Sequence, residues 1–262
     1  MKEIHLIEEF LTANLGYVRE KYSDKASLTV SAKTSANDLL TEVDLTVQKR
    51  FVDLVSDAFP GDLIVGEEGG YSRYPEDRNA RCWVIDPIDG TNNFVRGLFP
   101  IFAISIAFTV RGEVSAAGVI LPATGDLFLA ENGSGSFRNG QRLHVSEVQA
   151  VNEACVHVDF CTPANRDELL ARTGEVLRNA GQIRCHGSAV ASICQIATGD
   201  VDGYVHLGLD PWDFAAAKLI VEEAAGMTSR LDGRLLRVFA PKSGLVITNG
   251  AIHSEVVRML NR

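Results

Sequence analysis

Residues 83–94 read W-V-I-D-P-I-D-G-T-N-N-F, an apolar stretch that runs directly into two aspartates. We expect a strand whose end holds Asp86 rigidly. Pro87 then fixes a turn, so that Asp89 returns toward the same point. Two carboxylates aimed at one point repel each other unless a cation lies between them. Because carboxylate oxygens are hard ligands, they select Mg²⁺, Mn²⁺ or Ca²⁺ rather than zinc. The stretch therefore predicts a divalent cation at the end of a buried strand.

The residues that follow add groups that bind anions. Gly90 and Thr91 would offer backbone N–H groups and a hydroxyl beside the cation, at the expected start of a helix, where a phosphate binds well. The alternative interpretation is an ordinary acidic turn, because Asp-Pro and Asp-Gly are common turn dipeptides.

Two other acidic segments favour a metal site over a simple turn. Residues 63–70, L-I-V-G-E-E-G-G, are a second apolar strand that runs into Glu67. Residues 210–214, D-P-W-D-F, place Asp213 at the start of an expected helix. Three element ends that carry acids predict one shared site if the fold brings them together.

The composition limits the possible partners. The chain has 262 residues, 46% of them hydrophobic and 23% charged, as in an ordinary globular protein. Its net charge of −9 and the lack of a Lys/Arg run argue against nucleic-acid binding. There is no signal-peptide pattern, and the uncharged run at 97–110 is too short to span a bilayer. Five cysteines without a C-x-x-C pattern predict reduced thiols in a cytoplasmic protein.

The pattern of apolar residues changes near Val148. Before it, two segments with helical spacing accompany a series of strands and a hairpin at 137–142 with an Asn-Gly turn. After it, strands and helices alternate. We therefore expect an α+β half at residues 1–148 and an α/β half at residues 149–262. The other expected elements are helices at 4–18, 43–55, 166–180, 188–198, 213–225 and the C-terminus, and strands at 63–66, 82–85, 102–110, 115–121, 127–131, 154–159, 182–184, 203–207 and 245–248.

Three segments, in this order and spacing, resemble the signatures of the inositol monophosphatase family. They are G-E-E-G from Gly66, W-V-I-D-P-I-D-G-T-N-N-F from Trp83, and P-W-D-F-A-A-A-K-L-I-V-E-E-A-A-G from Pro211. Members of this family are Mg²⁺-dependent, lithium-sensitive phosphomonoesterases. The resemblance covers nearly the whole chain. It implies a layered αβαβα sandwich, with a large antiparallel sheet in the N-terminal half and a smaller mixed sheet in the C-terminal half, and it suggests a homodimer.

The resemblance also implies a set of ligands for two or three Mg²⁺ ions per subunit. Asp86 would bridge two cations. Glu67 and the backbone carbonyl of Ile88 would complete the first site, and Asp89 and Asp213 would complete the second. Two cations about 3.5–4 Å apart can stabilise both the attacking and the leaving oxygen of a phosphoryl transfer.

The catalytic residues implied by the resemblance are Thr91, Asp44 and Glu67. Thr91 and Asp44 match the residues that orient and deprotonate the attacking water. Because Asp44 lies where a helix is expected to start, its alternative role is an N-cap carboxylate. Glu68 is a weaker ligand candidate, with a solvated surface role as the alternative.

The substrate contacts follow from the same resemblance. Lys33 matches a lysine near the metals, where it could balance charge, and Gly90 and Thr91 would contact the phosphate. The segment that would line the substrate side consists of Gly187, Ser188 and Ala189.

His206 is a departure from the family pattern. In many inositol-phosphate hydrolases a glutamate stands there and accepts hydrogen bonds from ring hydroxyls, whereas an imidazole can donate as well as accept. The leading hypothesis is hydrolysis of a small phosphorylated alcohol. Inositol monophosphate comes first, then histidinol phosphate, which the Asp210 carboxylate could attract, then a sugar bisphosphate or nucleotide 3′-phosphate. The alternative from another class is a binding protein of the transcription machinery.

Overall fold

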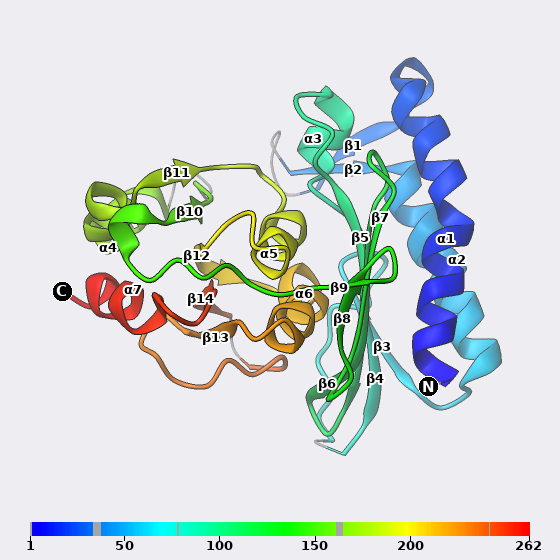
Figure 1. The fold of residues 1–262 in the computed structure, drawn as a ribbon. Coiled ribbons are helices and arrows are strands. Elements are labelled where there is room, and N and C mark those ends of the chain that lie inside the picture. Colours follow the sequence, from blue (N-terminus) through cyan, green and yellow to red (C-terminus); the bar gives the residue numbers. More distant parts are fainter. Residues whose placement is uncertain (1, 34–37, 78, 161–164, 241) are drawn as a thin grey trace.

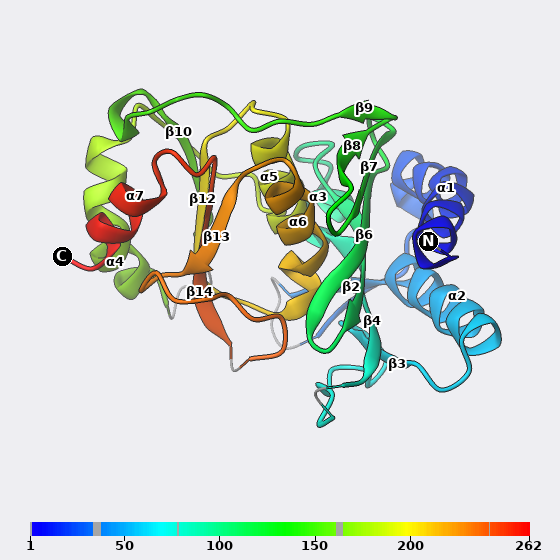
Figure 2. The ribbon, with the colours of Figure 1, turned by 60° about the horizontal axis from the view of Figure 1, so that its bottom comes forward.

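The computed structural model describes residues 2–33, 38–77, 79–160, 165–240 and 242–262. The elements form five layers: a helix pair, a large sheet, a second helix pair, a smaller sheet and a third helix pair (Figures 1 and 2). This arrangement confirms the expected layered sandwich. The three pairs, in the order of the layers, are α1 (Lys2–Ser23) with α2 (Glu42–Ala58), α5 (Ala189–Ala197) with α6 (Pro211–Glu223), and α4 (Arg166–Asn179) with α7 (His253–Leu260).

The larger sheet has seven strands in the order β3-β4-β5-β6-β7-β8-β9. Only β3 and β4 are parallel among these neighbours, so the expected antiparallel character is confirmed. The strands are β3 (Leu63–Gly66), β4 (Arg81–Asp89), β5 (Ala103–Val110), β6 (Glu113–Leu121), β7 (Asp126–Glu131), β8 (Gly135–Arg138) and β9 (Gln141–Arg142).

Strand β4 is longer than the sequence pattern predicted. We expected it to end near Ile85, but its pairing with β5 continues, with Asp86 opposite Ser105 and Asp89 opposite Ala103. The register is irregular between these two pairs, at Pro87, which has no N–H group to donate. Both aspartates therefore belong to a buried strand rather than to a turn beyond it.

The smaller sheet has five strands in the order β11-β10-β12-β14-β13. Strand β10 is parallel to β11 and β12, and β14 is antiparallel to β12 and β13, so the sheet is mixed as expected. These strands are β10 (Cys155–Val158), β11 (Gln182–Arg184), β12 (Gly203–Leu209), β13 (Met227–Arg230) and β14 (Ser243–Thr248). The pattern did not predict β13 or the hairpin β1 (Val30–Ala32) with β2 (Leu39–Thr41), whereas the helix start expected at Gly90 and Thr91 is the short helix α3 (Thr91–Arg96).

Three hydrophobic cores fill the spaces between the layers. One joins α1 and α2 to the large sheet through residues such as Phe51 and Trp83, and another joins α4 and α7 to the small sheet. The middle core contains α5 and α6, and its residues come from both sheets. Because α6 packs against the large sheet, it brings Asp213 of the C-terminal half close to strand β4 of the N-terminal half. The division near Val148 stays a prediction.

Two expectations from composition can be compared with the structure. Among the described residues, no helix has the length and apolar character needed to cross a membrane. The four described cysteines carry thiols rather than disulfides; Cys82 and Cys194 are buried, Cys155 is half-buried and Cys185 is exposed.

Candidate metal and phosphate site

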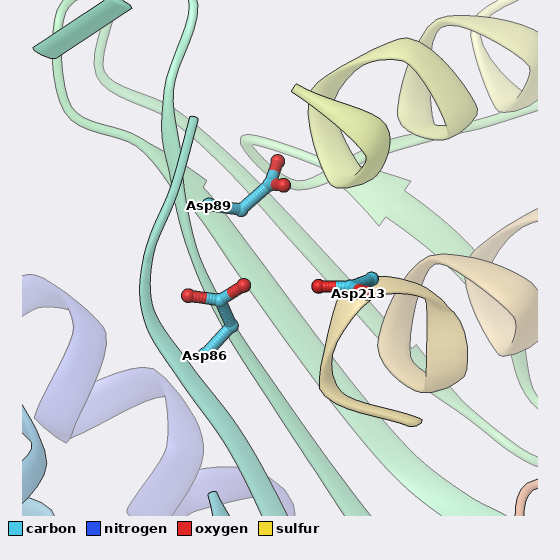
Figure 3. Close-up of side chains that lie close together, drawn as sticks. All are labelled: Asp86, Asp89 and Asp213. Carbon is cyan, nitrogen blue, oxygen red and sulfur yellow. The ribbon is translucent and has the colours of Figure 1, made fainter. Parts of the chain in front are cut away.

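Three aspartates from two layers surround one space (Figure 3). Asp86 and Asp89 lie on β4, and Asp213 lies in the first turn of α6. One carboxylate oxygen of each lies within 4.8 Å of those of the other two. Asp86 is 1% exposed and Asp89 is 7% exposed. The sequence therefore predicted correctly that these three side chains converge.

The three carboxylates destabilise one another in their charged forms. Burial, the Glu67 charge and the Asp89 charge raise the pKa of Asp86 well above its ordinary value, and the same causes act on Asp213. Burial raises the pKa of Asp89 to about 7, although hydrogen bonds from Ser188 and its neighbours oppose the shift. Buried carboxylates that repel each other and supply only oxygen atoms fit a hard divalent cation. The cluster could hold such an ion.

Glu67 lies near this cluster but outside its closest group. Its Oε1 atom is 2.6 Å from Lys33 Nζ, and Lys33 also forms an ion pair with Glu68. Burial opposes the charge of Lys33, but the two glutamates raise its pKa. Glu68 is only 5% exposed, so its alternative solvated role is wrong. Lys33 thus balances the charge of two glutamates beside the aspartates.

Thr91 and Asp44 lie together, as expected for a catalytic pair. The Thr91 hydroxyl is 3.3 Å from Asp44 Oδ1 and 2.9 Å from the Ile88 carbonyl oxygen. Asp44 is fully buried, and burial raises its pKa to about 6, although hydrogen bonds from Thr41 oppose this shift. Helix α2 begins at Glu42 with Thr41 as its N-cap, so Asp44 is not the N-cap but the third helical residue of a capping box.

The segment expected on the substrate side donates hydrogen bonds to Asp89, one of the expected metal ligands. Ser188 is the N-cap of α5, and its hydroxyl donates a hydrogen bond to Asp89. The backbone N–H groups of Ala189 and Val190 donate to the same carboxylate at 3.2 and 3.0 Å. Gly90 passes close by with a φ of +87°, and a Cβ atom there would lie 3.0 Å from Ser188 Cβ. Only glycine fits this contact.

A cavity of about 220 Å³ opens beside the aspartates. The residues that line it include Asp89, Asp213, Asp159, Tyr204 and His206. It adjoins a larger hollow of about 550 Å³ that shares His206 and Asp213. The cavity therefore opens directly beside two of the three aspartates.

His206 and Asp210 have local partners that affect their expected roles. His206 Nδ1 accepts a hydrogen bond from the Gly208 N–H at 3.0 Å, and burial lowers the pKa of this histidine. Asp210 accepts a hydrogen bond from the Tyr74 hydroxyl at 3.3 Å and from Lys242 at 2.6 Å. Because Lys242 already pairs with this carboxylate, Asp210 is a poor attractant for the amine of a substrate.

Several residues around the site were not found from the sequence. Asn93 donates to the carbonyl oxygens of Ile101 at 2.8 Å and His186 at 2.7 Å, and so joins the loop before β5 to the loop before α5. Asp159 and Tyr204 line the cavity. Asp159 has no acidic neighbour in the sequence; its position at the end of the strand predicted at 154–159 was the only available signal.

Known proteins resemble this chain along nearly its full length. The model of the inositol monophosphatase family matches residues 4–262. A fructose-1,6-bisphosphatase/inositol-1-monophosphatase from Thermotoga maritima is 38% identical over 241 residues, which cover 88% of this chain and 86% of that protein. The Nus factor SuhB of Escherichia coli is 34% identical over 218 residues, covering 82% and 80% of the two chains. The solved structure of a Thermotoga maritima IMPase has a TM-score of 0.87 and 33% identity, and it covers 100% of this chain and 97% of that one. The chain therefore belongs to the inositol monophosphatase family.

Proposed function

We propose that this protein hydrolyses a small phosphate monoester with Mg²⁺ as its cation, and that inositol monophosphate is the first candidate substrate. The observation that carries the proposal is the cluster of Asp86, Asp89 and Asp213. Burial raises the pKa of each carboxylate, and the charges of Glu67 and Asp89 raise it further for Asp86 and Asp213; such a cluster is stabilised by a hard cation.

Asp86, Asp89 and Asp213 would hold the cation, with Glu67 and the Ile88 carbonyl as further ligands. Mg²⁺ bound there would neutralise the phosphate, which carries about two negative charges near neutral pH, and polarise its oxygen atoms. We infer that two or three ions bind per chain.

The proton chemistry falls to Asp44 and Thr91. The Thr91 hydroxyl lies 3.3 Å from a buried carboxylate whose pKa burial raises to about 6. A base with a pKa near the working pH is well suited to accept a proton. Asp44 would therefore accept the proton of the attacking water through the Thr91 hydroxyl, which orients that water. The backbone N–H groups of Gly90 and Thr91 would face the phosphate.

The leaving alcohol would lie in the cavity beside His206. Since Gly208 donates to Nδ1, the neutral imidazole carries its proton on Nε2 and offers a donor. A glutamate at this position would offer only acceptors. This difference supports an alcohol with an acceptor oxygen next to the ester.

A sugar bisphosphate is the second candidate substrate. The Thermotoga maritima relative is named both a fructose-1,6-bisphosphatase and an inositol-1-monophosphatase. The hollow of about 550 Å³ beyond His206 leaves room for a longer alcohol. Histidinol phosphate ranks below it, because Lys242 pairs with the Asp210 carboxylate that would attract its amine.

A role in transcription is the candidate from a different class, since one relative is named a Nus factor. Binding to RNA polymerase in a pull-down that survives Asp213→Asn would support it. We place hydrolysis first because the three aspartates, Asp44 and Thr91 are all present in one site.

The test of hydrolysis is phosphate release across a panel of inositol, sugar, histidinol and nucleotide phosphates. We expect turnover with Mg²⁺, none in excess EDTA, recovery when Mg²⁺ is restored, and inhibition by millimolar Li⁺. Full activity in EDTA would contradict the proposal. Light scattering of the purified protein would test the proposed homodimer, and fractionation of cells would test the proposed cytoplasmic location.

A further inference from the structure

Asp159 follows β10 and is 9% exposed. Its Oδ1 atom accepts hydrogen bonds from the backbone N–H groups of His186 and Gly187, both at 3.2 Å, and from the Cys185 thiol at 3.3 Å. Its Oδ2 atom accepts a hydrogen bond from the Tyr204 hydroxyl at 3.0 Å. Hydrogen bonds to a charged acceptor are stronger than those between neutral groups. One carboxylate therefore binds the whole turn at residues 185–187.

The next residues along the chain bind a second carboxylate. Ser188, Ala189 and Val190 donate to Asp89, which belongs to the other half of the molecule. Gly187, between the two sets of donors, has a φ of +71°. In this left-handed conformation a residue other than glycine would be strained. The segment at residues 185–190 is thus fixed at both ends, by Asp159 on one side and by Asp89 on the other.

We propose that Asp159 is a positioning residue for the metal site. It holds the turn at residues 185–187, and the turn sets the direction from which the three donors reach Asp89. The proposal rests on the proposed function in that Asp89 is taken as a Mg²⁺ ligand. When the turn relaxes, Asp89 loses donors that fix its carboxylate. Outer partners of ligating carboxylates commonly contribute 10- to 100-fold to metal affinity.

The experiment compares Asp159→Ala with Asp159→Asn. Alanine removes every acceptor from the turn. Asparagine keeps one oxygen for the N–H groups of His186 and Gly187, and its amide can donate to the Tyr204 oxygen. The matched control is Asp167→Asn, which removes one charge from an exposed position on α4. Mg²⁺ affinity is measured by calorimetry without substrate, and amide hydrogen exchange is measured on the metal-free protein.

We expect Asp159→Ala to weaken Mg²⁺ binding by about tenfold or more and to speed exchange at the Ala189 and Val190 amides. With saturating Mg²⁺ and substrate, kcat should fall less than Mg²⁺ affinity. Asp159→Asn should stay within about threefold of the wild type, since it retains most of the hydrogen bonds, and Asp167→Asn should not differ from it. Tyr204→Phe, which removes one donor to Asp159, should give the same changes as Asp159→Ala on a smaller scale.

Three outcomes would overturn the proposal. The first is unchanged Mg²⁺ affinity and exchange in Asp159→Ala. The second is an Asp159→Asn variant whose Mg²⁺ affinity falls as far as that of Asp159→Ala. That result would mean that the Asp159 charge acts on the cation directly and not through the turn. The third applies if Asp159→Ala does not fold: it is unchanged Mg²⁺ affinity and unchanged amide exchange in Tyr204→Phe. The exchange measurement needs neither metal nor substrate. Faster exchange in a protein that hydrolyses no phosphate ester would therefore support Asp159 while refuting the proposed function.

Discussion

Two sets of carboxylates lie at or beside the same cavity, and their surroundings are opposite. Asp86 and Asp213 lie opposite other acids, and burial together with repulsion raises the pKa of both. Asp159 lies opposite donors from a turn and from Tyr204. Burial of an aspartate is therefore not in itself a sign of a metal site. The partners decide whether the charge is already compensated by the protein or requires a cation.

Asp89 belongs to both environments. It belongs to the cluster with Asp86 and Asp213, yet it also accepts hydrogen bonds from Ser188, Ala189 and Val190. These donors stabilise its charged form and oppose the effect of burial on its pKa. Asp89 therefore connects the aspartate cluster to the hydrogen-bonded segment at residues 185–190. Substitutions in the cluster and in the segment should change activity and stability to different extents.

The largest effect is expected for Asp213→Asn. The amide removes one charge from the proposed cation site, so kcat/KM should fall by about 100-fold or more, as when a main electrostatic group is lost from a catalytic site. The metal-free protein should unfold at an equal or higher temperature at pH 7, because the Glu67 and Asp89 charges no longer repel residue 213. The Asp213 carboxylate accepts a hydrogen bond from the Asp210 N–H at 2.8 Å, and the amide oxygen of the variant can still accept it.

Asp89→Asn is the matched comparison for this prediction. It should lose activity to a similar extent, but it should also lower the free energy of unfolding by about 1–3 kcal/mol, since an amide NH₂ would face donors such as Ser188 and Val190. Phosphate release and thermal unfolding in EDTA measure both effects. A rate above one tenth of wild type in either variant would mean that the residue is not a ligand.

The contrast also shows what the sequence could predict about the site. Asp86 and Asp89 are three residues apart, and Asp213 lies in a recognisable motif, so their role could be inferred before their geometry was known. Asp159 could not be inferred, because its donors come from positions such as Gly187 and Tyr204 that are distant in the chain. Nothing local distinguishes an aspartate that accepts from a remote turn from one that faces solvent.

The fold shows the same limit. Long amphipathic segments and the Asn-Gly turn allowed α1, α2 and the β8–β9 hairpin to be predicted, whereas the layering was implied by the family resemblance. Strand β13 was missed because M-T-S-R has no clear alternation, and the strand is defined by its pairing with β14. Strand β4 was predicted too short, since Pro87 indicates a turn and only the pairing of Asp89 with Ala103 continues the strand.

A smaller effect, on specificity rather than rate, is expected for His206→Glu. His206 lines the cavity, and because its Nδ1 accepts from Gly208, the neutral imidazole carries its proton on Nε2. A carboxylate would present acceptors for the hydroxyls of an inositol ring. The ratio of kcat/KM for inositol 1-phosphate over fructose 1,6-bisphosphate should therefore rise, by about tenfold or more, since unpaired buried polar groups discriminate strongly.

The measurement must include a generic small phosphomonoester, on which Asp44, Thr91 and the aspartates should still act. An unchanged ratio would place His206 outside the substrate contacts. An equal loss on all substrates would make the residue structural or catalytic instead, and our assignment of it would be wrong.

The smallest effect concerns stability alone and tests a buried histidine on β10, the strand that leads to Asp159. His157 on β10 is fully buried, with Nε2 at 3.1 Å from Gln195 Oε1 and its ring centroid 4.2 Å from that of His186. Burial, followed by the His186 and Arg184 charges, lowers its pKa to about 4, although Gln195 and Asp159 oppose the shift. The unfolded chain therefore binds this proton at a higher pH than the native protein does.

Because the unfolded state carries more protons between about pH 6.5 and pH 4, the stability contributed by neutral His157 is present above this range and is lost as the pH falls through it. The loss between pH 7.5 and pH 5 should be about 2 kcal/mol, or a few degrees in Tm. His157→Gln should reduce this pH-dependent fall in Tm, whereas His144→Gln, at an exposed histidine, should leave it unchanged. Equal falls in the wild type and in His157→Gln would show that the buried imidazole is not a source of acid sensitivity, because the native and unfolded states would then bind its proton equally well.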